Sequence, residues 1–223
     1  MSEPGPLAPA TGWLEAELER ELPGLCLRFC ELAVGRSGPL TGDSPTDIAA
    51  RLGELSSRIR GARAIGIRSE PVPSAYRVFF HQVGLDPDVQ RTPGEAAVLE
   101  RMLRGGFLSG GMLDDVLLIA LMDTGVPVWA LDSATLDGPL GIRSSNEGEP
   151  LGRSPGEPAL PGGRLVVADA SVALAPLFGD CAPAHRPGPG TRRLTLFALQ
   201  VPGVPGLYVE EALWGSASAL EAA

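Results

Sequence analysis

Two carboxylates on either side of a glycine, Glu147 and Glu149, are the first candidates for binding chemistry. They lie in "GIRSSNEGEP", directly after a strand-like run of residues. A glutamate on a turn beside a pocket can accept a charged hydrogen bond from an amino group. The alternative is a polar hairpin turn, in which the same residues serve only the backbone. The residues alone leave both interpretations open.

The usual catalytic motifs are absent from the chain. It contains no G-x-S-x-G elbow, no H-E-x-x-H, no Walker A loop and no G-x-G-x-x-G after a strand. Two histidines leave little room for a catalytic triad, and all 18 basic residues are arginines, which excludes Schiff-base chemistry on a lysine. Ser44, in "GDSPTD", is explained more economically as a helix cap than as a nucleophile.

The three cysteines do not predict a disulfide framework or a metal site. On a strand through "LCLRFCELAV", Cys26 and Cys30 would lie about 13 Å apart, too far for a disulfide or a shared metal ion. Cys181 and His185, in "CAPAHRPGPG", are two possible ligands without further partners. We therefore expect no metal ion and no cofactor.

The formal net charge of −9 disfavours a broad phosphate-binding surface, so any contact with RNA must be local. Two groups of arginines could supply it, although a solvated helix face is the more economical explanation of each group taken alone. These candidate RNA-binding residues are Arg51, Arg58, Arg60 and Arg63 in the first group, and Arg186, Arg192 and Arg193 in the second. No DNA partner is expected.

Helices are predicted in the first half of the chain and strands in the second. An acidic helix is expected over residues 13–22 and a strand over 25–34, and a further helix begins with Ser44 as N-cap and Pro45 in its first turn. Thr92 and Glu95 predict a capping box. Beyond Gly125, strands are expected in "VPVWAL", "GPLGIRS", "GRLVVAD" and "RLTLFALQV", followed by a terminal helix. This order predicts an α+β fold.

Residues 112–122 are apolar almost all round, which is typical of a helix buried on every side. No apolar run is long enough to cross a membrane, and the first residues carry no secretion signal, so a cytoplasmic location is expected. A lead-in without regular structure is expected over residues 1–12, and one domain over 13–223.

The order of several segments resembles the B3/B4 domain, the tRNA-editing module in the beta subunit of bacterial phenylalanyl-tRNA synthetase. The segments are "YRVFFHQVGLDPDVQRTPGEAAVLERMLRGG", "LDDVLLIALMDTGVPVWALD", "GIRSSNEGEP" and "GGRLVVAD", with "LFALQVPGVPG" resembling the last strand. The resemblance covers residues 74–203 and is closer to free-standing proteins that carry this domain. It implies a layered B3/B4-like α+β fold, with the helices packed against the strand-rich half, and a pocket from which a wrongly attached tyrosine is hydrolysed.

The resemblance also implies a degenerate pocket. Trp129 stands where the family has a pocket histidine, and Leu117 and Leu118 replace a Thr-Asn pair; a pocket arginine falls near Leu108. The positions that survive are Asp115, Asp132, Glu147, Gly148, Glu149 and Ala168. The expected substrate-binding residues are therefore Trp129, Glu147, Glu149, Ala168, Leu117 and Leu118, and no catalytic residue is assigned.

Two functions remain open. One is hydrolysis of a mischarged aminoacyl-tRNA in trans. The other is a non-catalytic module that binds a small amino-acid-like ligand, with Trp129 partly filling the pocket and Glu147 or Glu149 nearby to meet an amino group. For Trp129 itself, the alternative is that it is an ordinary core residue.

Overall fold

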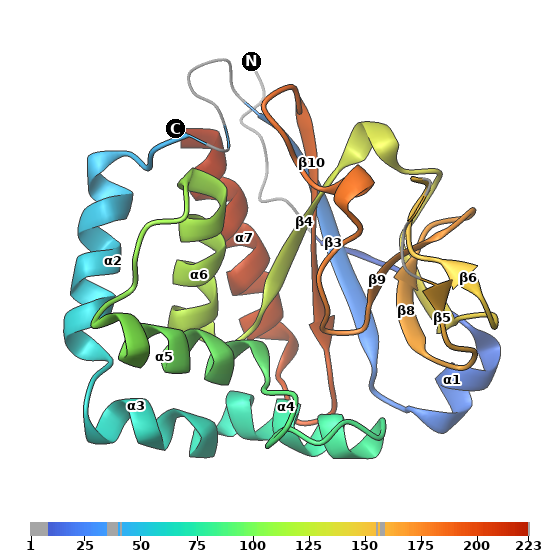
Figure 1. Cartoon of the computed structure of the whole chain (residues 1–223), viewed down its shortest axis with the longest axis horizontal. Coiled ribbons are helices and arrows are strands. Elements are labelled where there is room, and N and C mark those ends of the chain that lie inside the picture. Colours follow the sequence, from blue (N-terminus) through green and yellow to red (C-terminus); the bar gives the residue numbers. More distant parts are fainter. Residues whose placement is uncertain (1–8, 35–39, 41, 155, 157–158, 223) are drawn as a thin grey trace.

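The computed structural model describes residues 9–34, 40, 42–154, 156 and 159–222. It is an α+β protein, as the sequence predicted, in which most of the helices lie on one side and the sheets on the other (Figure 1). The helices are α1 (Ala16–Glu21), α2 (Thr46–Arg58), α3 (Ala62–Gly66), α4 (Pro71–Gln82), α5 (Pro93–Arg104), α6 (Met112–Thr124) and α7 (Gly206–Ala222). Short 3-10 turns are η1 (Ile67–Ser69), η2 (Ser133–Thr135) and η3 (Pro183–His185).

The first sheet is antiparallel, with strand order β1-β3-β10-β4. Its strands are β1 (Ala10–Thr11), β3 (Cys26–Ala33), β10 (Arg193–Gln200) and β4 (Val128–Asp132). Strand β10 is buried along most of its length because α7 packs against the sheet that it shares with β3. Apolar side chains on both faces of β10 are what a strand in the middle of a covered sheet requires.

The second sheet has the order β2-β5-β8-β9, and a two-stranded ladder β6-β7 lies apart from it. Its strands are β2 (Trp13–Leu14), β5 (Gly141–Ser144), β8 (Leu165–Ala168) and β9 (Ala173–Pro176), while the ladder joins β6 (Glu149–Pro150) and β7 (Ala159–Leu160). Gly12 alone separates β1 in the first sheet from β2 in the second. A Cβ there would lie 2.6 Å from the Leu140 carbonyl oxygen, so a larger residue does not fit.

Helix α6 confirms the prediction of a buried central helix. Most of its side chains are buried, and Leu117 and Leu118 are partly buried, whereas Asp123 faces solvent. The helix packs against α7 and α2 and continues through Gly125 into β4. The φ of +76° at Gly125 explains the glycine at this step, since a left-handed residue ends the helix.

Three local predictions differ from the structure. Trp13 and Leu14 form β2 rather than the start of a helix, because Trp13 packs flat on Gly141 and pairs with β5. Ser44 does not cap α2: the N-cap is Pro45, and the Ser44 hydroxyl donates instead to the Asp115 carboxylate. Residues 1–8 of the expected lead-in lie outside the described residues, but Ala10–Thr11 form β1, so order begins earlier than predicted.

Candidate functional site

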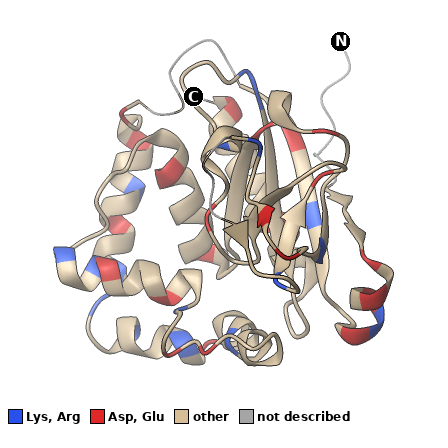
Figure 2. Ribbon diagram, turned by 45° about the vertical axis from the view of Figure 1, so that its right-hand side comes forward, with Lys and Arg blue, Asp and Glu red and all other residues tan. Residues whose placement is uncertain are grey.

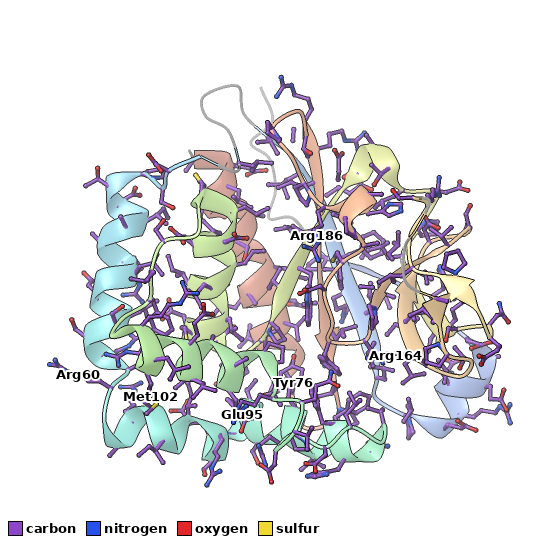
Figure 3. The ribbon with its side chains drawn as sticks, viewed as in Figure 1. Arg60, Tyr76, Glu95, Met102, Arg164 and Arg186 are labelled. Carbon is purple, nitrogen blue, oxygen red and sulfur yellow. The ribbon has the colours of Figure 1, made fainter. Side chains whose placement is uncertain are left out.

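A cavity of about 360 Å³ opens between the start of α6, strand β4 and the loop that precedes η3. Trp129, Leu117 and Leu113 supply apolar walls, and Leu40 adds to them. Asp114, Asp180 and Arg186 bring charge to the same cavity. Figure 3 shows Arg186 near the middle of the molecule, on the loop in front of the first sheet. An apolar pocket with a few convergent polar groups is the usual form of a small-molecule site.

Trp129 is held on the edge strand β4 by its neighbour Phe197 on β10. The two residues are register partners, and their rings stack with centroids 5.4 Å apart and planes 13° apart. One face of the indole is therefore covered, while the side chain remains only partly buried and lines the cavity. Trp129 is both a packed aromatic residue and a cavity wall.

Phe178 forms the aromatic floor behind Trp129, with ring centroids 6.2 Å apart. Its φ of +61° makes it the only non-glycine with positive φ among the described residues. Such a backbone costs about 1–2 kcal/mol for a bulky residue. The rings of Tyr76, Phe79 and Phe80 surround Phe178 and hold it there. The strained turn leads directly into Asp180 and Cys181 at the cavity.

The charged residues of the cavity are Asp114, Asp180 and Arg186. Partial burial raises the pKa of the Asp114 carboxyl above its ordinary value, and neighbouring Asp115 raises it further, while Arg186 acts in the opposite direction. The Arg186 guanidinium donates to the Cys181 carbonyl oxygen at 2.6 Å and forms an ion pair with Asp180 at 3.5 Å. A carboxyl group and a guanidinium group thus line the same cavity.

Cys181 lines the cavity but is not a nucleophile at neutral pH. Burial raises the pKa of its thiol to about 12, so the reactive thiolate is scarce. Among the described residues, no cluster of three or more His, Cys, Asp or Glu side chains is arranged to hold a metal ion.

Asp115 stabilises the segments that form the rim of the cavity. Its carboxylate is 1% exposed and accepts hydrogen bonds from the Ser44 and Ser109 hydroxyls, both at 2.5 Å, and from the Gly110 amide at 2.9 Å. These bonds join the segment before α2, the loop before α6 and α6 itself. The resemblance named Asp115 as a surviving pocket position, and its place as a buried carboxylate with three donors depends on segments that the sequence alone does not bring together.

Several predicted pocket residues lie elsewhere. Leu118 and Leu108 line a separate cavity of about 270 Å³ on another side of α6. Ala168 is fully buried in β8, in a cluster that also contains Trp13. Asp132, at the end of β4, accepts from the Thr191 hydroxyl at 2.6 Å and the Ala134 amide at 3.0 Å. Of the six expected substrate-binding residues, Trp129 and Leu117 line the Trp129 cavity.

Glu147 and Glu149 do not line the Trp129 cavity. Glu149 forms a two-pronged ion pair with Arg143, and the hydrogen bond from that arginine is the main reason that the pKa of the Glu149 carboxyl is lowered. Glu147 accepts from the Gly162 amide at 2.7 Å. Both side chains therefore hold the turn after β5. The structure favours the hairpin interpretation, and Asp114 is the carboxylate at the cavity instead.

The fold places the members of the two arginine groups in different surroundings. Arg51 and Arg58 both contact Asp123, at 3.0 and 2.7 Å, so part of their charge is neutralised. Arg60 projects outward at the helical edge of the molecule (Figure 3). Arg186 belongs to the Trp129 cavity, and Arg193 pairs with Glu31 at the start of β10. Figure 2 shows acidic and basic segments interspersed along the helices.

Comparison with known proteins shows a relationship over part of the chain. No family model matches the chain. A stretch of 99 residues, 43% of the chain, is 37% identical to the phenylalanine–tRNA ligase beta subunit of Xanthomonas axonopodis pv. citri, and the match is 38% identical in Xanthomonas oryzae pv. oryzae and 35% in Xylella fastidiosa. The matched stretch spans about 12% of the length of these curated relatives.

The chain thus contains a region related to the phenylalanine–tRNA ligase beta subunit, which links it to the tRNA synthetases. Within the part of the chain that the structure describes, none of the helices has the length and hydropathy needed to cross a bilayer.

Proposed function

We propose that this chain is a B3/B4-like domain that binds the amino-acid group of aminoacyl-tRNA, or a free amino acid, in the Trp129 cavity. The observation that carries the proposal is the joining of an aromatic and aliphatic wall to Asp114 and Arg186 in one cavity. The relationship to the synthetase beta subunit supports an amino acid as ligand, free or esterified to tRNA.

The charges of the cavity fit an α-amino acid. The ammonium group meets Asp114, and the carboxylate of a free amino acid meets Arg186, each as a charge-assisted hydrogen bond worth about 1.5–3 kcal/mol. The indole of Trp129 is larger than the imidazole of the resembled family and removes volume from the cavity. A small side chain is therefore preferred over the phenol ring of tyrosine.

Hydrolysis of the ester is the second candidate, and the raised pKa of Asp114 is the observation that favours it. A carboxylate with a raised pKa is a better general base. In this reaction Asp114 accepts a proton from a water molecule whose oxygen attacks the ester carbonyl carbon. The C–O bond to the ribose then breaks, and the ribose oxygen takes the proton from Asp114. The products are the free amino acid and uncharged tRNA.

Calorimetric titration with alanine, serine and tyrosine tests the binding function. We expect saturable binding of the smaller amino acids, at least tenfold weaker in Asp114→Asn and in Arg186→Gln. Glu147→Gln is the matched control, because that carboxylate lies outside the cavity, and it should bind as the wild type does. A change in tryptophan fluorescence on binding should vanish in Trp129→Phe. Absence of binding for all three amino acids would contradict the proposal.

Deacylation of Ala-tRNA and Tyr-tRNA separates binding from hydrolysis. Hydrolysis of Ala-tRNA that is lost in Asp114→Asn, with folding unchanged, supports the second candidate. No deacylation by a protein that binds the amino acid leaves the binding function alone. Rapid hydrolysis of Tyr-tRNA by the wild type would show that Trp129 does not restrict the cavity.

A further inference from the structure

We propose that an apolar groove beside α7 binds the end of α5 of a second copy of this chain, so that copies associate head to tail. The groove, which we call the α7 groove, has a volume of about 200 Å³ and lies between α2, α6 and α7. Its apolar walls are Ile48, Val116, Ile119, Ala120, Trp214 and Ala219. Small-molecule sites usually measure about 300–1,000 Å³, so a groove of this size suits a single side chain better than a whole ligand.

Helix α7 carries apolar side chains on two faces, and the fold covers one of them. Val209, Leu213 and Leu220 are buried where α7 packs on β3 and β10, between α6 and the first sheet (Figure 1). Leu207 and Trp214 are about two turns apart on another face of the helix. These two side chains are 70% and 52% exposed. Large apolar side chains grouped on an exposed face are typical of a surface that contacts another protein.

The α7 groove is acidic. Asp123 and Glu211 line it, and every charged residue of α7 is a glutamate. Asp123 already forms ion pairs with Arg51 and Arg58, whereas the Glu211 side chain faces solvent. The partner that fits this groove therefore presents an apolar side chain next to a positive charge.

The end of α5 supplies this combination. Leu103 is 79% exposed and Met102 is 50% exposed, and Arg104 follows them directly. Arg104 pairs with Glu100 of the same helix at 3.0 Å, and an ion pair between two exposed side chains is weak enough to be exchanged for a carboxylate of the partner. Arg60 projects outward at the same corner of the molecule as Met102 (Figure 3).

The α7 groove and the end of α5 lie on opposite sides of α6. Leu118 lines the cavity between α5 and α6, whereas Ala120 lines the α7 groove. Two residues along an α-helix correspond to a rotation of about 200°. Surfaces on opposite sides of one molecule cannot face each other across a two-fold axis. Their contact is therefore heterologous, and it adds copies in a row or closes a ring.

Sedimentation velocity of the whole chain, from micromolar to millimolar concentration, tests the inference. We expect the average mass to rise above the 23.1 kDa of one copy, and beyond two copies, as the concentration increases. Added salt should weaken the association, because it screens the attraction between Glu211 and Arg104.

Three single substitutions examine the two surfaces. Trp214→Ala in the groove and Leu103→Asp on α5 should each weaken the association by about tenfold or more, because a few central side chains carry most of the affinity of an interface. Glu211→Arg is a second groove variant that leaves the apolar contacts of α7 intact, and melting temperatures check the fold of each variant. Val89→Ser is the control: this valine is 80% exposed but belongs to neither surface, so the variant should associate as the wild type does.

A mixture of two variants tests the head-to-tail arrangement. Trp214→Ala keeps its α5 end and Leu103→Asp keeps its α7 groove, so together they should form one-to-one dimers that grow no further. A wild type that stays a single copy at every concentration overturns the inference. Wild-type dimers that never grow, or a mixture that does not recover association, overturn the head-to-tail contact. None of these outcomes depends on whether amino acids bind at Trp129.

Discussion

Asp115 shows how one buried carboxylate can organise a site that it does not enter. It accepts three hydrogen bonds from two segments that form the rim of the Trp129 cavity. An asparagine keeps the shape but replaces one acceptor oxygen by a donor, so at least one of the three donors loses its partner. We expect Asp115→Asn to lower the free energy of unfolding by about 3 kcal/mol, measured by urea denaturation.

Ser44→Ala is the graded counterpart of that change, because it removes one donor and leaves the carboxylate intact. Its expected loss is about 1 kcal/mol. A loss in Asp115→Asn no larger than in Ser44→Ala would show that the carboxylate does not hold the three segments together.

Asp114 has a separate pH signature. Its pKa is raised in the folded protein, chiefly by partial burial, from an ordinary value of 3.8. A raised pKa means that the ionised carboxyl opposes folding, so its contribution to stability is present below about pH 4 and is lost as the pH rises through the folded pKa. We expect the stability of Asp114→Asn, relative to wild type, to increase over this range and then level off.

Urea midpoints measured from pH 3 to pH 8 test this expectation for Asp114. A difference between variant and wild type that stays constant with pH would contradict it. Such a result would also remove the support for Asp114 as a general base.

At the scale of single residues, the sequence indicated which types of residue could form the site but not where the fold places them. Trp129 and Leu117 were expected at a pocket because of the resemblance to the B3/B4 domain, and both line the Trp129 cavity. Arg186 was identified only as part of a basic group, and Asp114 was not singled out as a site residue, because their meeting depends on the loop after β9. That loop bends at Phe178, whose positive φ is set by surrounding rings that sequence patterns do not report.

The turn between β5 and β6 is an element stabilised by one ion pair. The Arg143 and Glu149 side chains are 20% and 13% exposed. Glu149→Gln should lower the free energy of unfolding by about 2 kcal/mol at neutral pH. The pKa of Glu149 is lowered from an ordinary 4.5, mainly by the hydrogen bond from Arg143, so this stability is present above pH 4.5 and is lost as the pH falls through the folded pKa.

Urea denaturation at pH 7 and at pH 3 measures the effect of Glu149→Gln. The deficit should be clear at pH 7 and reduced at pH 3. Glu147→Gln is the control on the same turn: its carboxylate contacts only a backbone amide in the described structure, so a smaller deficit is expected. Equal losses in the two variants would mean that the ion pair adds nothing to the turn.

Elements with strong local signals were predicted well. The capping box of Thr92 and Glu95 begins α5, and the apolar run of α6 and the long strand β10 lie where expected. The two-residue strands β1 and β2 were missed, because two residues show no periodicity and their pairing depends on partners far along the chain.

For the whole molecule, the division of the arginine groups gives a test of RNA contact. Arg192 and Arg193 line a cavity of about 610 Å³ between the first sheet and η2, whereas Arg60 and Arg63 lie on and beside α3 at the helical edge. We expect Arg192→Glu/Arg193→Glu to weaken tRNA binding and to flatten its dependence on salt, by about one unit of the logarithmic slope for each lost phosphate contact.

Filter binding over a salt series measures this, with Arg60→Glu/Arg63→Glu as the control. The control should bind tRNA with nearly the wild-type slope. A reversed result would move the RNA contact to Arg60 and Arg63, and unchanged slopes in both variants would exclude all four of these arginines.

The place of β10 in the sequence determines when the first sheet can form. Strand β3 ends at Ala33, and its partner β10 begins only at Arg193, yet β10 lies between β3 and β4. During synthesis, both neighbours therefore leave the ribosome long before the strand that joins them, with edges that have no permanent partner. Pairing across such a sequence separation is slow, and unpaired edges invite association with other chains. The nascent chain is thus most exposed to aggregation just before β10 emerges, because the facing edges of β3 and β4 are still unpaired.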